Sequence, residues 1–288
     1  MKPPPFDYAA PTSVAEALSL LGDPGREAMV LAGGQSLVPM LNMRLARPEL
    51  LVDLKRVEGL DYIREVPGAV VIGAMTTKRS VEDSALVRDK LPLLHAATLE
   101  IGHPPIRNRG TMGGSMAQAD PAAEYPAVAI ALGATMRVVG PAGERTIDAG
   151  DFFVSYLTTA LAEDEILVEV SVPTSGERTG WAFGELSRRH GDFALTGVAM
   201  TVTLDAAGAC AGAAIVPFGV GPSPVRAIAA EDVLRGRLPD AALYREAGRA
   251  VGASLTDVLS DNHASAAYRR HLAGVLTERG LPEAVSRA

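Results

Sequence analysis

Cysteine is almost absent from this chain of 288 residues, in which Cys210 is the only one. No internal disulfide can form, and low cysteine use is typical of the reducing cytoplasm, where we expect the protein to work. An iron–sulfur cluster needs about four thiolates, so we expect none on this chain. The N-terminus MKPPPFDYAAP has no apolar run, and no stretch approaches the ~20 apolar residues that span a bilayer. We therefore expect neither a signal peptide nor a membrane span.

Motifs of several catalytic classes are absent as well. The five histidines show no HExxH or paired metal spacing, so ordinary surface or core histidines are expected rather than a metal site. Neither GxSxG nor GxxxxGK[ST] occurs, which leaves hydrolases and nucleoside triphosphatases without support. The net charge of −7 gives no reason to expect nucleic acid or an acidic membrane as a partner.

The hydrophobic and charged contents, 48% and 21%, are those of a globular protein, and local patterns divide the chain into three regions. In residues 1–55, TSVAEALSLLG predicts a helix that is capped by Thr12 or Ser13 and ends at Gly22, while AMVLAGG and ELLVDL predict strands. In residues 56–178, several elements are predicted. They are a hairpin of YIREV and AVVIGAM, a helix over 80–100 with a break near Pro92, and strands at TMRVVG and EILVEVSVP.

The third region, residues 179–288, has a different pattern. FALTGVAMTVTL and ACAGAAIVPFG predict two strands joined by the turn DAAG. Three helices are then predicted at about 224–235, 239–253 and 263–279. Strands followed by consecutive helices indicate an α+β class rather than an alternating βαβ one.

Two glycine pairs stand out, Gly33 with Gly34 after a predicted strand, and Gly113 with Gly114 in RGTMGGSMAQAD. Small hydroxyl or amide side chains flank both pairs. Such a loop lets backbone N–H groups approach a phosphate, but a tight turn also needs glycine. The two pairs are consistent with a ligand that has two phosphates, such as a dinucleotide, and equally with two structural turns. The Rossmann fingerprint G-x-G-x-x-G is absent after the first strand.

The segments AGGQSLVPMLNMRLARPELLVDL and IRNRGTMGGSMAQADPAAEYPA together resemble the flavin-binding medium subunit of the molybdenum hydroxylases. That family includes xanthine dehydrogenase, carbon monoxide dehydrogenase, and nicotine and caffeine dehydrogenases. The resemblance covers essentially the whole chain. It implies a two-lobed FAD-binding domain of the vanillyl-alcohol-oxidase-like (PCMH) type, with lobes at 1–55 and 56–178. An α+β C-terminal domain of the CO dehydrogenase flavoprotein type would then occupy residues 179–288.

The resemblance further implies FAD between the two lobes, with both glycine loops on its pyrophosphate. The positions that match the family's cofactor-binding motifs are Ala32, Gly33, Gly34, Gln35, Ser36, Leu37, Ile101, Thr111, Gly113, Gly114, Ser115, Gln118, Asp120, Glu124 and Leu167. Many relatives have asparagine where this chain has Ser115. Glu124 stands where many have an aspartate near a ribose or ribityl hydroxyl, the alternative being a surface carboxylate at the start of a helix.

Two further positions depart from the family pattern. Phe193 falls where several relatives place a tyrosine against the flavin ring, so a stacking contact without the phenolic hydrogen bond is implied. An ordinary core phenylalanine at the start of a strand is the alternative. Relatives often have a lysine just before this segment, where this chain has Gly184 and Glu185, which puts a lysine contact to the flavin in doubt.

The implied function is that of an oxidoreductase subunit, which carries FAD and moves electrons from two [2Fe–2S] clusters on a small partner subunit to an external acceptor. A large partner subunit would hold the molybdenum cofactor, in a dimer of three-subunit units. We expect no catalytic side chain and no metal ligand on this chain. The alternatives are a self-sufficient FAD oxidase and a non-enzymatic assembly protein. Carbon monoxide, purines and nicotine-like N-heterocycles stay open as substrates.

Overall fold

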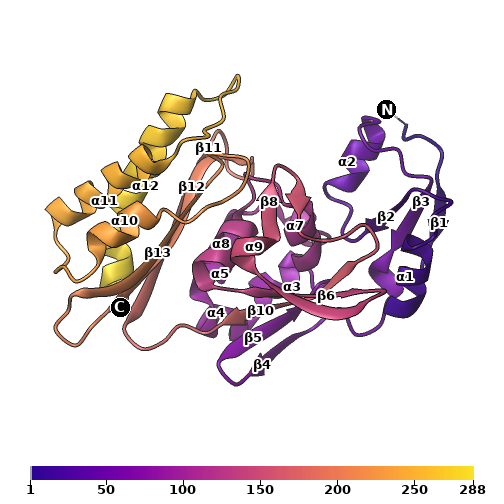
Figure 1. Cartoon of the computed structure of the whole chain (residues 1–288), viewed down its shortest axis with the longest axis horizontal. Coiled ribbons are helices and arrows are strands. Elements are labelled where there is room, and N and C mark those ends of the chain that lie inside the picture. Colours follow the sequence, from indigo (N-terminus) through magenta and orange to yellow (C-terminus); the bar gives the residue numbers. More distant parts are fainter. Residues whose placement is uncertain (1) are drawn as a thin grey trace.

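The computed structural model describes residues 2–288, whose strands form three larger sheets and a ribbon of β8 (Phe153–Ser155) and β9 (Thr158–Thr159). The three sheets follow one another along the long axis of the molecule, with the N-terminal sheet at one end and the C-terminal helices at the other (Figure 1). Within residues 2–288, no helix is both long enough and apolar enough to cross a membrane. The divisions after residues 55 and 178 stay predictions.

The N-terminal sheet is parallel, with strand order β1-β3-β2. Its elements are β1 (Asp7–Ala9), α1 (Val14–Leu21), β2 (Ala28–Leu31), α2 (Leu37–Asn42), β3 (Leu50–Asp53) and the short 3-10 helix η1 (Leu54–Arg56). The predicted cap of α1 is Ser13, whose hydroxyl accepts a hydrogen bond from the Glu16 N–H at 3.2 Å. The Glu16 carboxylate in turn accepts one from the Thr12 N–H at 2.8 Å. Strand β1 was not predicted, because three residues are too few to show an alternating pattern.

The central sheet has strand order β4-β5-β10-β6-β7, and all its neighbours are antiparallel. Its elements are β4 (Ile63–Val66), β5 (Ala69–Gly73), α3 (Lys78–Asp83), α4 (Ala85–Lys90), α5 (Pro92–Glu100), α6 (Pro104–Arg107), α7 (Met112–Gln118), α8 (Glu124–Leu132), β6 (Thr135–Gly140), β7 (Gly143–Asp148), α9 (Ala149–Phe152) and β10 (Ile166–Pro173). The predicted hairpin is confirmed, since Val66 pairs with Ala69. The predicted helix over 80–100 breaks near Pro92 and also at Ser84, whose hydroxyl caps α4 by accepting from the Val87 N–H.

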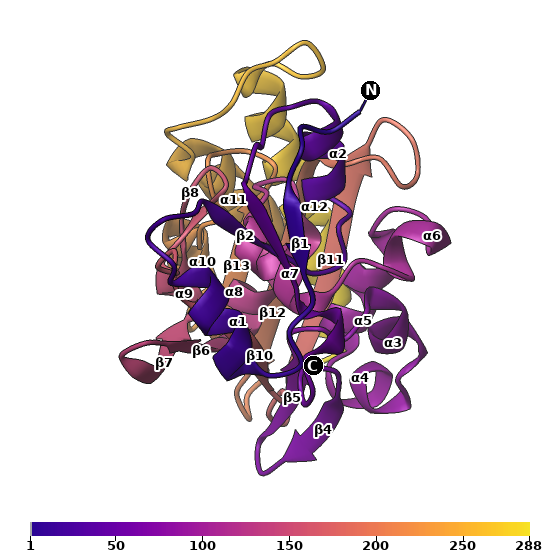
Figure 2. The same ribbon diagram turned by 90° about the vertical axis from the view of Figure 1, so that its right-hand side faces the viewer.

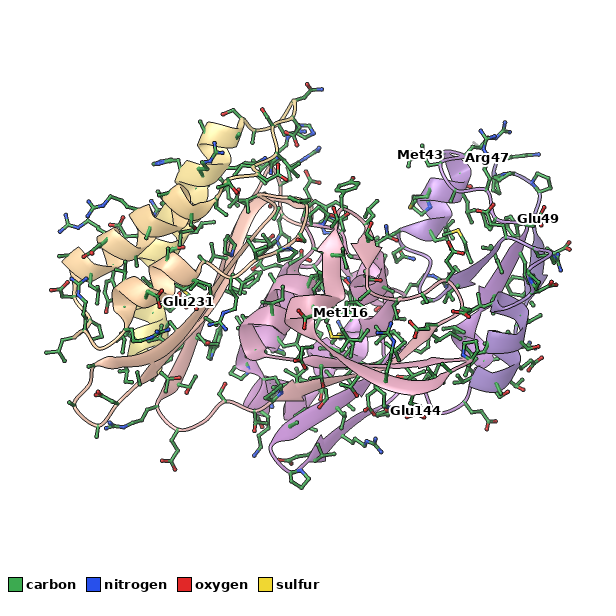
Figure 3. All side chains as sticks on the ribbon, in the orientation of Figure 1. Met43, Arg47, Glu49, Met116, Glu144 and Glu231 are labelled. Atoms are coloured by element: carbon green, nitrogen blue, oxygen red, sulfur yellow. The ribbon has the colours of Figure 1, made fainter. Side chains whose placement is uncertain are left out.

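Helix α8 lies in the middle of the molecule and is buried on all sides. Every residue from Glu124 to Ala131 is buried. The helix packs between the central sheet and the C-terminal sheet, which is why its sequence is apolar around the whole circumference. Met116 lies in the same core, whereas Met43 and Arg47 lie at the outer end of the N-terminal part (Figure 3).

The C-terminal sheet is antiparallel, with strand order β11-β12-β13. Its elements are β11 (Thr179–Ser187), β12 (Ala194–Leu204), β13 (Cys210–Phe218), α10 (Ile228–Leu234), α11 (Ala241–Ser254) and α12 (Ala266–Ser286). Side chains alternate along β12: Val198 and Met200 face the helices, while Ala199 joins the core around α8. The two predicted strands and three predicted helices are present. The sequence pattern missed β11, and α12 continues to Ser286, past Pro282.

Candidate functional site

The first glycine loop joins β2 to α2 and leaves its backbone donors unused. Among residues 2–288, no backbone carbonyl accepts a hydrogen bond from the N–H groups of residues 33–37. Gly34 has a φ of +73°, a left-handed conformation that glycine adopts without strain. Ser36 precedes α2, but its side chain makes no capping hydrogen bond. The loop therefore offers several N–H groups and one hydroxyl to an anion.

Gly33 allows the first loop to touch the segment that leads into the second. A Cβ atom at this position would lie 2.1 Å from the carbonyl oxygen of Arg109 and 2.8 Å from the Cα of Gly110. Both are backbone atoms, which cannot move aside as a flexible side chain could. The absence of a side chain at Gly33 thus brings two segments that are distant in the sequence together at one site.

The second glycine loop begins α7 and uses its N–H groups internally. Met112 donates to the Thr76 carbonyl at 2.9 Å, and Gly113 donates to the Ala74 carbonyl at 2.8 Å. The N–H group of Gly114 is bonded to the Thr111 hydroxyl at 3.0 Å, and that of Ser115 to the Thr111 carbonyl at 3.2 Å. A Cβ at Gly113 would lie 2.5 Å from the Cβ of Ala74. The glycine pair here allows close packing. Because the N–H groups of this loop are already bonded, only its side chains are available to bind a ligand.

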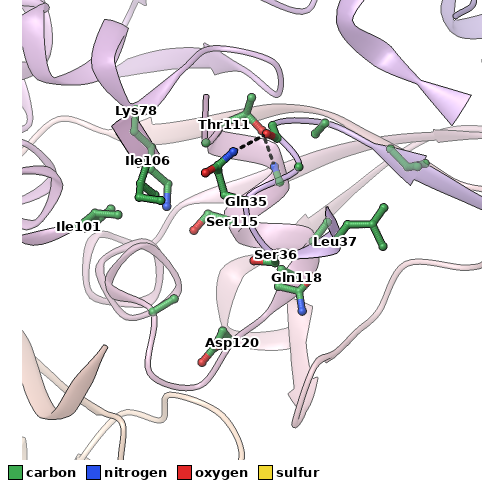
Figure 4. A pocket seen from close by; sticks show the side chains of 18 of the residues that line it. Gln35, Ser36, Leu37, Lys78, Ile101, Ile106, Thr111, Ser115, Gln118 and Asp120 are labelled. Atoms are coloured by element: carbon green, nitrogen blue, oxygen red, sulfur yellow. Dashed lines mark hydrogen bonds between the residues drawn. The ribbon is translucent and has the colours of Figure 1, made fainter. Parts of the chain in front are cut away.

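A cavity of about 550 Å³ opens between the two loops (Figure 4). This volume is in the usual range for small-molecule sites, roughly 300–1,000 Å³. The predicted binding residues that line it are Ala32, Gly33, Gly34, Gln35, Ser36, Leu37, Ile101, Thr111, Gly114, Ser115, Gln118, Asp120, Glu124 and Phe193. Gly113 and Leu167 do not line it, because Gly113 packs against Ala74 and Leu167 is buried in the core.

Sequence reasoning missed Lys78, which lies on one wall of the cavity with Ile106 (Figure 4). The Lys78 side chain is buried, and its Nζ lies 5.3 Å from the centre of the Tyr125 ring. Burial lowers the pKa of Lys78, while the negative charge of Glu124 raises it. A lysine in the first turn of a helix is normally exposed, so nothing in MTTKRS indicated this position.

Two acidic residues of the cavity wall are withdrawn from water to different extents, Glu124 fully and Asp120 in part. Glu124 is only 4% exposed, which excludes the surface carboxylate that was the alternative. Burial raises the pKa of Glu124 to about 7, and the nearby positive charge of Lys78 opposes that rise. Burial also raises the pKa of Asp120, although its carboxylate accepts a hydrogen bond from the Ala122 N–H at 2.9 Å. Glu124 can therefore gain or lose a proton near neutral pH.

The turn between β11 and β12 closes one side of the cavity with Phe193. This side chain is 62% exposed, so the alternative of a core phenylalanine is wrong. Gly184 and Glu185, which stand where relatives often have a lysine, do not line the cavity. Oε2 of Glu185 is buried without a hydrogen-bond partner. Burial, followed by repulsion from Glu124 and Glu100, raises the pKa of Glu185 to about 8.

These features fit a dinucleotide better than a metal ion. The N–H groups of the first loop and the Ser36 hydroxyl suit a pyrophosphate, while apolar lining residues such as Ile101 and Phe193 suit aromatic rings. Across residues 2–288, no group of three or more His, Cys, Asp or Glu side chains could hold a metal ion.

Two family models match the chain and cover nearly all of it. The FAD-binding domain in molybdopterin dehydrogenase matches residues 4–175, and the CO dehydrogenase flavoprotein C-terminal domain matches residues 181–284. The chain belongs to the FAD-binding subunits of the molybdenum hydroxylases. The resemblance and the fold class inferred from the sequence are thereby confirmed.

Two relatives of this FAD-binding subunit match it over nearly their whole length. It is 43% identical to the alpha subunit of the 6-hydroxypseudooxynicotine dehydrogenase complex of Paenarthrobacter nicotinovorans, over 100% of this chain and 97% of the relative. It is 39% identical to the carbon monoxide dehydrogenase medium chain of Hydrogenophaga pseudoflava, over 100% and 99% of the two chains. A solved structure of carbon monoxide dehydrogenase from the same organism superposes with a TM-score of 0.96 at 40% identity, over 100% of both chains.

A structure of quinoline 2-oxidoreductase from Pseudomonas putida 86 is also similar, with a TM-score of 0.94, 37% identity and 99% coverage of both chains. Carbon monoxide and quinoline are chemically unlike, yet both structures contain a chain that shares the fold of this one. The family therefore establishes an FAD-binding oxidoreductase subunit. The contact of each individual residue with FAD stays a prediction.

Proposed function

We propose that this chain is the electron-transfer subunit of a molybdenum-containing hydroxylase or dehydrogenase. A small partner subunit would hold two [2Fe–2S] clusters, and a large one the molybdenum cofactor, assembled as a dimer of heterotrimers in the cytoplasm. An external acceptor would receive the electrons. The observation that carries the proposal is full-length similarity to subunits of dehydrogenase complexes.

FAD, when bound, supplies both one-electron and two-electron chemistry, which suits a relay between iron–sulfur clusters and a two-electron acceptor. The residues of this chain would bind and orient it. The N–H groups of residues 33–37 and the Ser36 hydroxyl would hold pyrophosphate oxygens, since within residues 2–288 these N–H groups have no backbone acceptor and the hydroxyl makes no capping bond. Ser115 and Gln118 would reach the remaining polar groups, and Phe193 would shield the ring system from water.

The cavity contains one group that favours a second candidate, the self-sufficient oxidase. Glu124 lines the cavity and has a pKa of about 7, and a buried acid with a pKa near the working pH can act as a general base. In the relay, the same carboxyl only accepts hydrogen bonds from hydroxyl groups of the cofactor. The two roles predict different behaviour of the isolated chain: an oxidase would oxidise substrate without partner subunits, whereas a relay subunit would not.

The isolated chain, loaded with FAD, separates these two functions. We expect it to pass electrons from dithionite to a dye or quinone and to oxidise no carbon monoxide, purine or N-heterocycle. Addition of the small and large partner subunits should restore substrate-dependent bleaching of the flavin absorbance in stopped flow. If the chain alone oxidises any of these substrates and Glu124→Gln abolishes that activity, the chain is an oxidase and the electron-relay proposal is wrong.

A further inference from the structure

A second hollow lies between helices of the C-terminal domain, and it is lined by other residues than the FAD cavity. It is a groove of about 310 Å³ between α11 and α12, which we call the α11–α12 groove. No residue lines both the groove and the cavity. Helices α11 and α12 form the outer layer at the end of the molecule opposite the N-terminal sheet (Figures 1 and 2). The groove is therefore accessible while FAD occupies the cavity.

Glycine makes the floor of the groove. A Cβ on Gly248 would lie 2.6 Å from the carbonyl oxygen of Gly274, and a Cβ on Gly274 would lie 2.7 Å from the carbonyl oxygen of Gly248. The two helices thus cross with their backbones in contact, as they do at other small-residue crossings. The floor is bare backbone, and long side chains from both helices rise on either side of it.

Those long side chains are mostly basic, although the whole chain has a net charge of −7. Arg245 and Arg249 line the groove from α11, and Arg270 and His271 line it from α12, against a single acid, Glu278. In the described residues, neither Arg245 nor Arg249 forms an ion pair. Unpaired positive charges repel one another, and an acidic partner would offset that repulsion.

Several other arginines of the same domain are paired with acids within it. Arg237 pairs with Glu246 at 2.9 Å, and Arg269 pairs with Asp261 at 2.6 Å. The Arg270 guanidinium is held in place by the carbonyl oxygens of Leu255 and Thr256, at 2.8 and 3.1 Å. In the groove, the carbonyl oxygens of Leu255 and Thr256 hold Arg270, while Arg245 and Arg249 form no ion pair with any described residue. Such guanidinium groups can bind carboxylates from outside.

We propose that the α11–α12 groove binds an acidic helix of another subunit of the complex. Arg245 and Arg249 are four residues apart on α11, so carboxylates four residues apart on a partner helix would face them. The glycine floor gives the partner backbone room to approach, and the salt-sensitive charge pairs would fix its register. This proposal depends on the proposed function in one respect, namely that the chain assembles with other subunits.

A phosphate ligand fits the groove less well than a carboxylate-bearing helix. The groove lies along the middle turns of both helices, where the backbone N–H groups are already used in the helix, so no backbone donors converge on an anion. Glu278 would repel a multiply charged phosphate, whereas a protein segment can place a basic side chain beside it. No aromatic side chain lines the groove to stack on a base apart from His271.

The test uses the complex purified through an affinity tag on this chain, with dissociation followed by mass photometry over a series of salt concentrations. We expect Arg245→Glu/Arg249→Glu to weaken assembly about tenfold or more and to flatten its salt dependence. Arg279→Glu is the matched control, because Arg279 is an exposed arginine on α12 that does not line the groove. A photo-cross-linking residue in place of His271 should attach to an Asp- or Glu-rich helix of one partner subunit.

The outcomes separate the groove from the flavin site. Equal effects of the groove and control variants, a cross-link to a second copy of this chain, or a wild-type chain that assembles with no partner would each overturn the proposal. So would micromolar binding of inorganic phosphate that the double variant abolishes, without any partner cross-link. Flavin released by acid precipitation and measured by its fluorescence reports FAD independently of the iron–sulfur clusters, so its absence would refute the proposed function and leave the docking result standing.

Discussion

The loop at residues 33–37 and the loop at residues 111–115 form walls of the same cavity, but they use their backbones in opposite ways. In the part of the chain that the structure describes, the N–H groups of the first loop have no backbone acceptor, and its serine makes no capping hydrogen bond. The second loop bonds the N–H groups of residues 112–115 to neighbouring carbonyls and to the Thr111 hydroxyl. One loop can bind an anion with its backbone, whereas the other can do so only with side chains.

Glycine therefore has two physical roles within one binding site. Gly34 provides a left-handed backbone conformation in a loop that lines the cavity and whose N–H groups have no backbone acceptor in residues 2–288. Gly113 removes a side chain so that α7 can pack directly against Ala74 at the end of the central sheet. Substitutions at the two positions should therefore separate loss of FAD from loss of stability.

The largest effect is expected from Gly34→Val. A β-branched residue is strongly disfavoured at φ +73°, so the loop should change conformation and turn its N–H groups away. We expect FAD affinity to fall by about 100-fold or more, because several charge-assisted hydrogen bonds are lost together. The measurement is flavin absorbance per chain after gel filtration.

The matched control for that substitution is Gly59→Val. Gly59 has φ +75° and does not line the cavity, so the backbone strain is the same and the ligand is not involved. Retention of about one FAD per chain in Gly59→Val is expected. Equal loss of FAD in both variants would show that strain, rather than the first loop's donors, governs binding.

Gly113→Ala should instead destabilise the protein. The added methyl group would meet the Ala74 Cβ at 2.5 Å, an overpacking that costs about 1–3 kcal/mol. The Tm should fall by roughly 3–10 °C in thermal unfolding followed by circular dichroism. Folded protein should still bind one FAD, and Gly150→Ala, where the methyl meets no atom within 4 Å, should change neither property.

Hydroxyl deletions test the same contrast with a smaller effect. Ser36→Ala should weaken FAD binding about tenfold without changing the Tm, because the hydroxyl makes no capping bond. Thr111→Ala removes the bond from the Gly114 N–H and should cost about 0.5–2 kcal/mol of stability. Isothermal titration with FAD and thermal unfolding of both variants measure the two quantities. The reverse assignment of effects would contradict the comparison.

The smallest effect concerns pH and the half-buried Glu185. Its folded-state pKa is raised from 4.5 to about 8, so the protonated form is favoured by folding, and stability falls as pH rises from about 4.5 through 8. Glu185→Gln removes the titrating group and should raise the Tm at pH 9 relative to wild type, but not at pH 5. Solvent screening limits the gain to about 1–2 kcal/mol, or roughly 2–5 °C. Glu58→Gln is the matched control, because Glu58 is exposed and lies outside the cavity.

Much of the fold and part of the site could be predicted from local patterns. Ser13 and Glu16 mark the start of α1 by themselves, since their hydrogen bonds are local. Most of the predicted cofactor residues line one cavity because they lie on continuous motifs of two loops. The sequence motif could not show that the second loop's N–H groups are internally bonded, because Ala74 and Thr76 come from a distant turn.

Other features depend on contacts between distant segments and leave no local signal. Lys78 is buried because Tyr125 of α8 lies beside it, although its own neighbours are polar. Strand β11 contains two glycines and the charged Glu185, which obscure its alternation, and pairing with β12 along its length defines it. Tertiary packing overrides local preference at both positions.

The central position of α8 has a consequence for how the chain can be divided. Residues of β12 and β13, among them Ala199 and Phe218, share one continuous apolar core with α8 and the central sheet. A protease that cut the backbone between β10 and β11 would therefore leave two fragments held together by that core (Figure 1). Each fragment made separately would expose the apolar surface that the other covers and should aggregate. The two segments matched by the two family models therefore share one core and should not separate as independent domains.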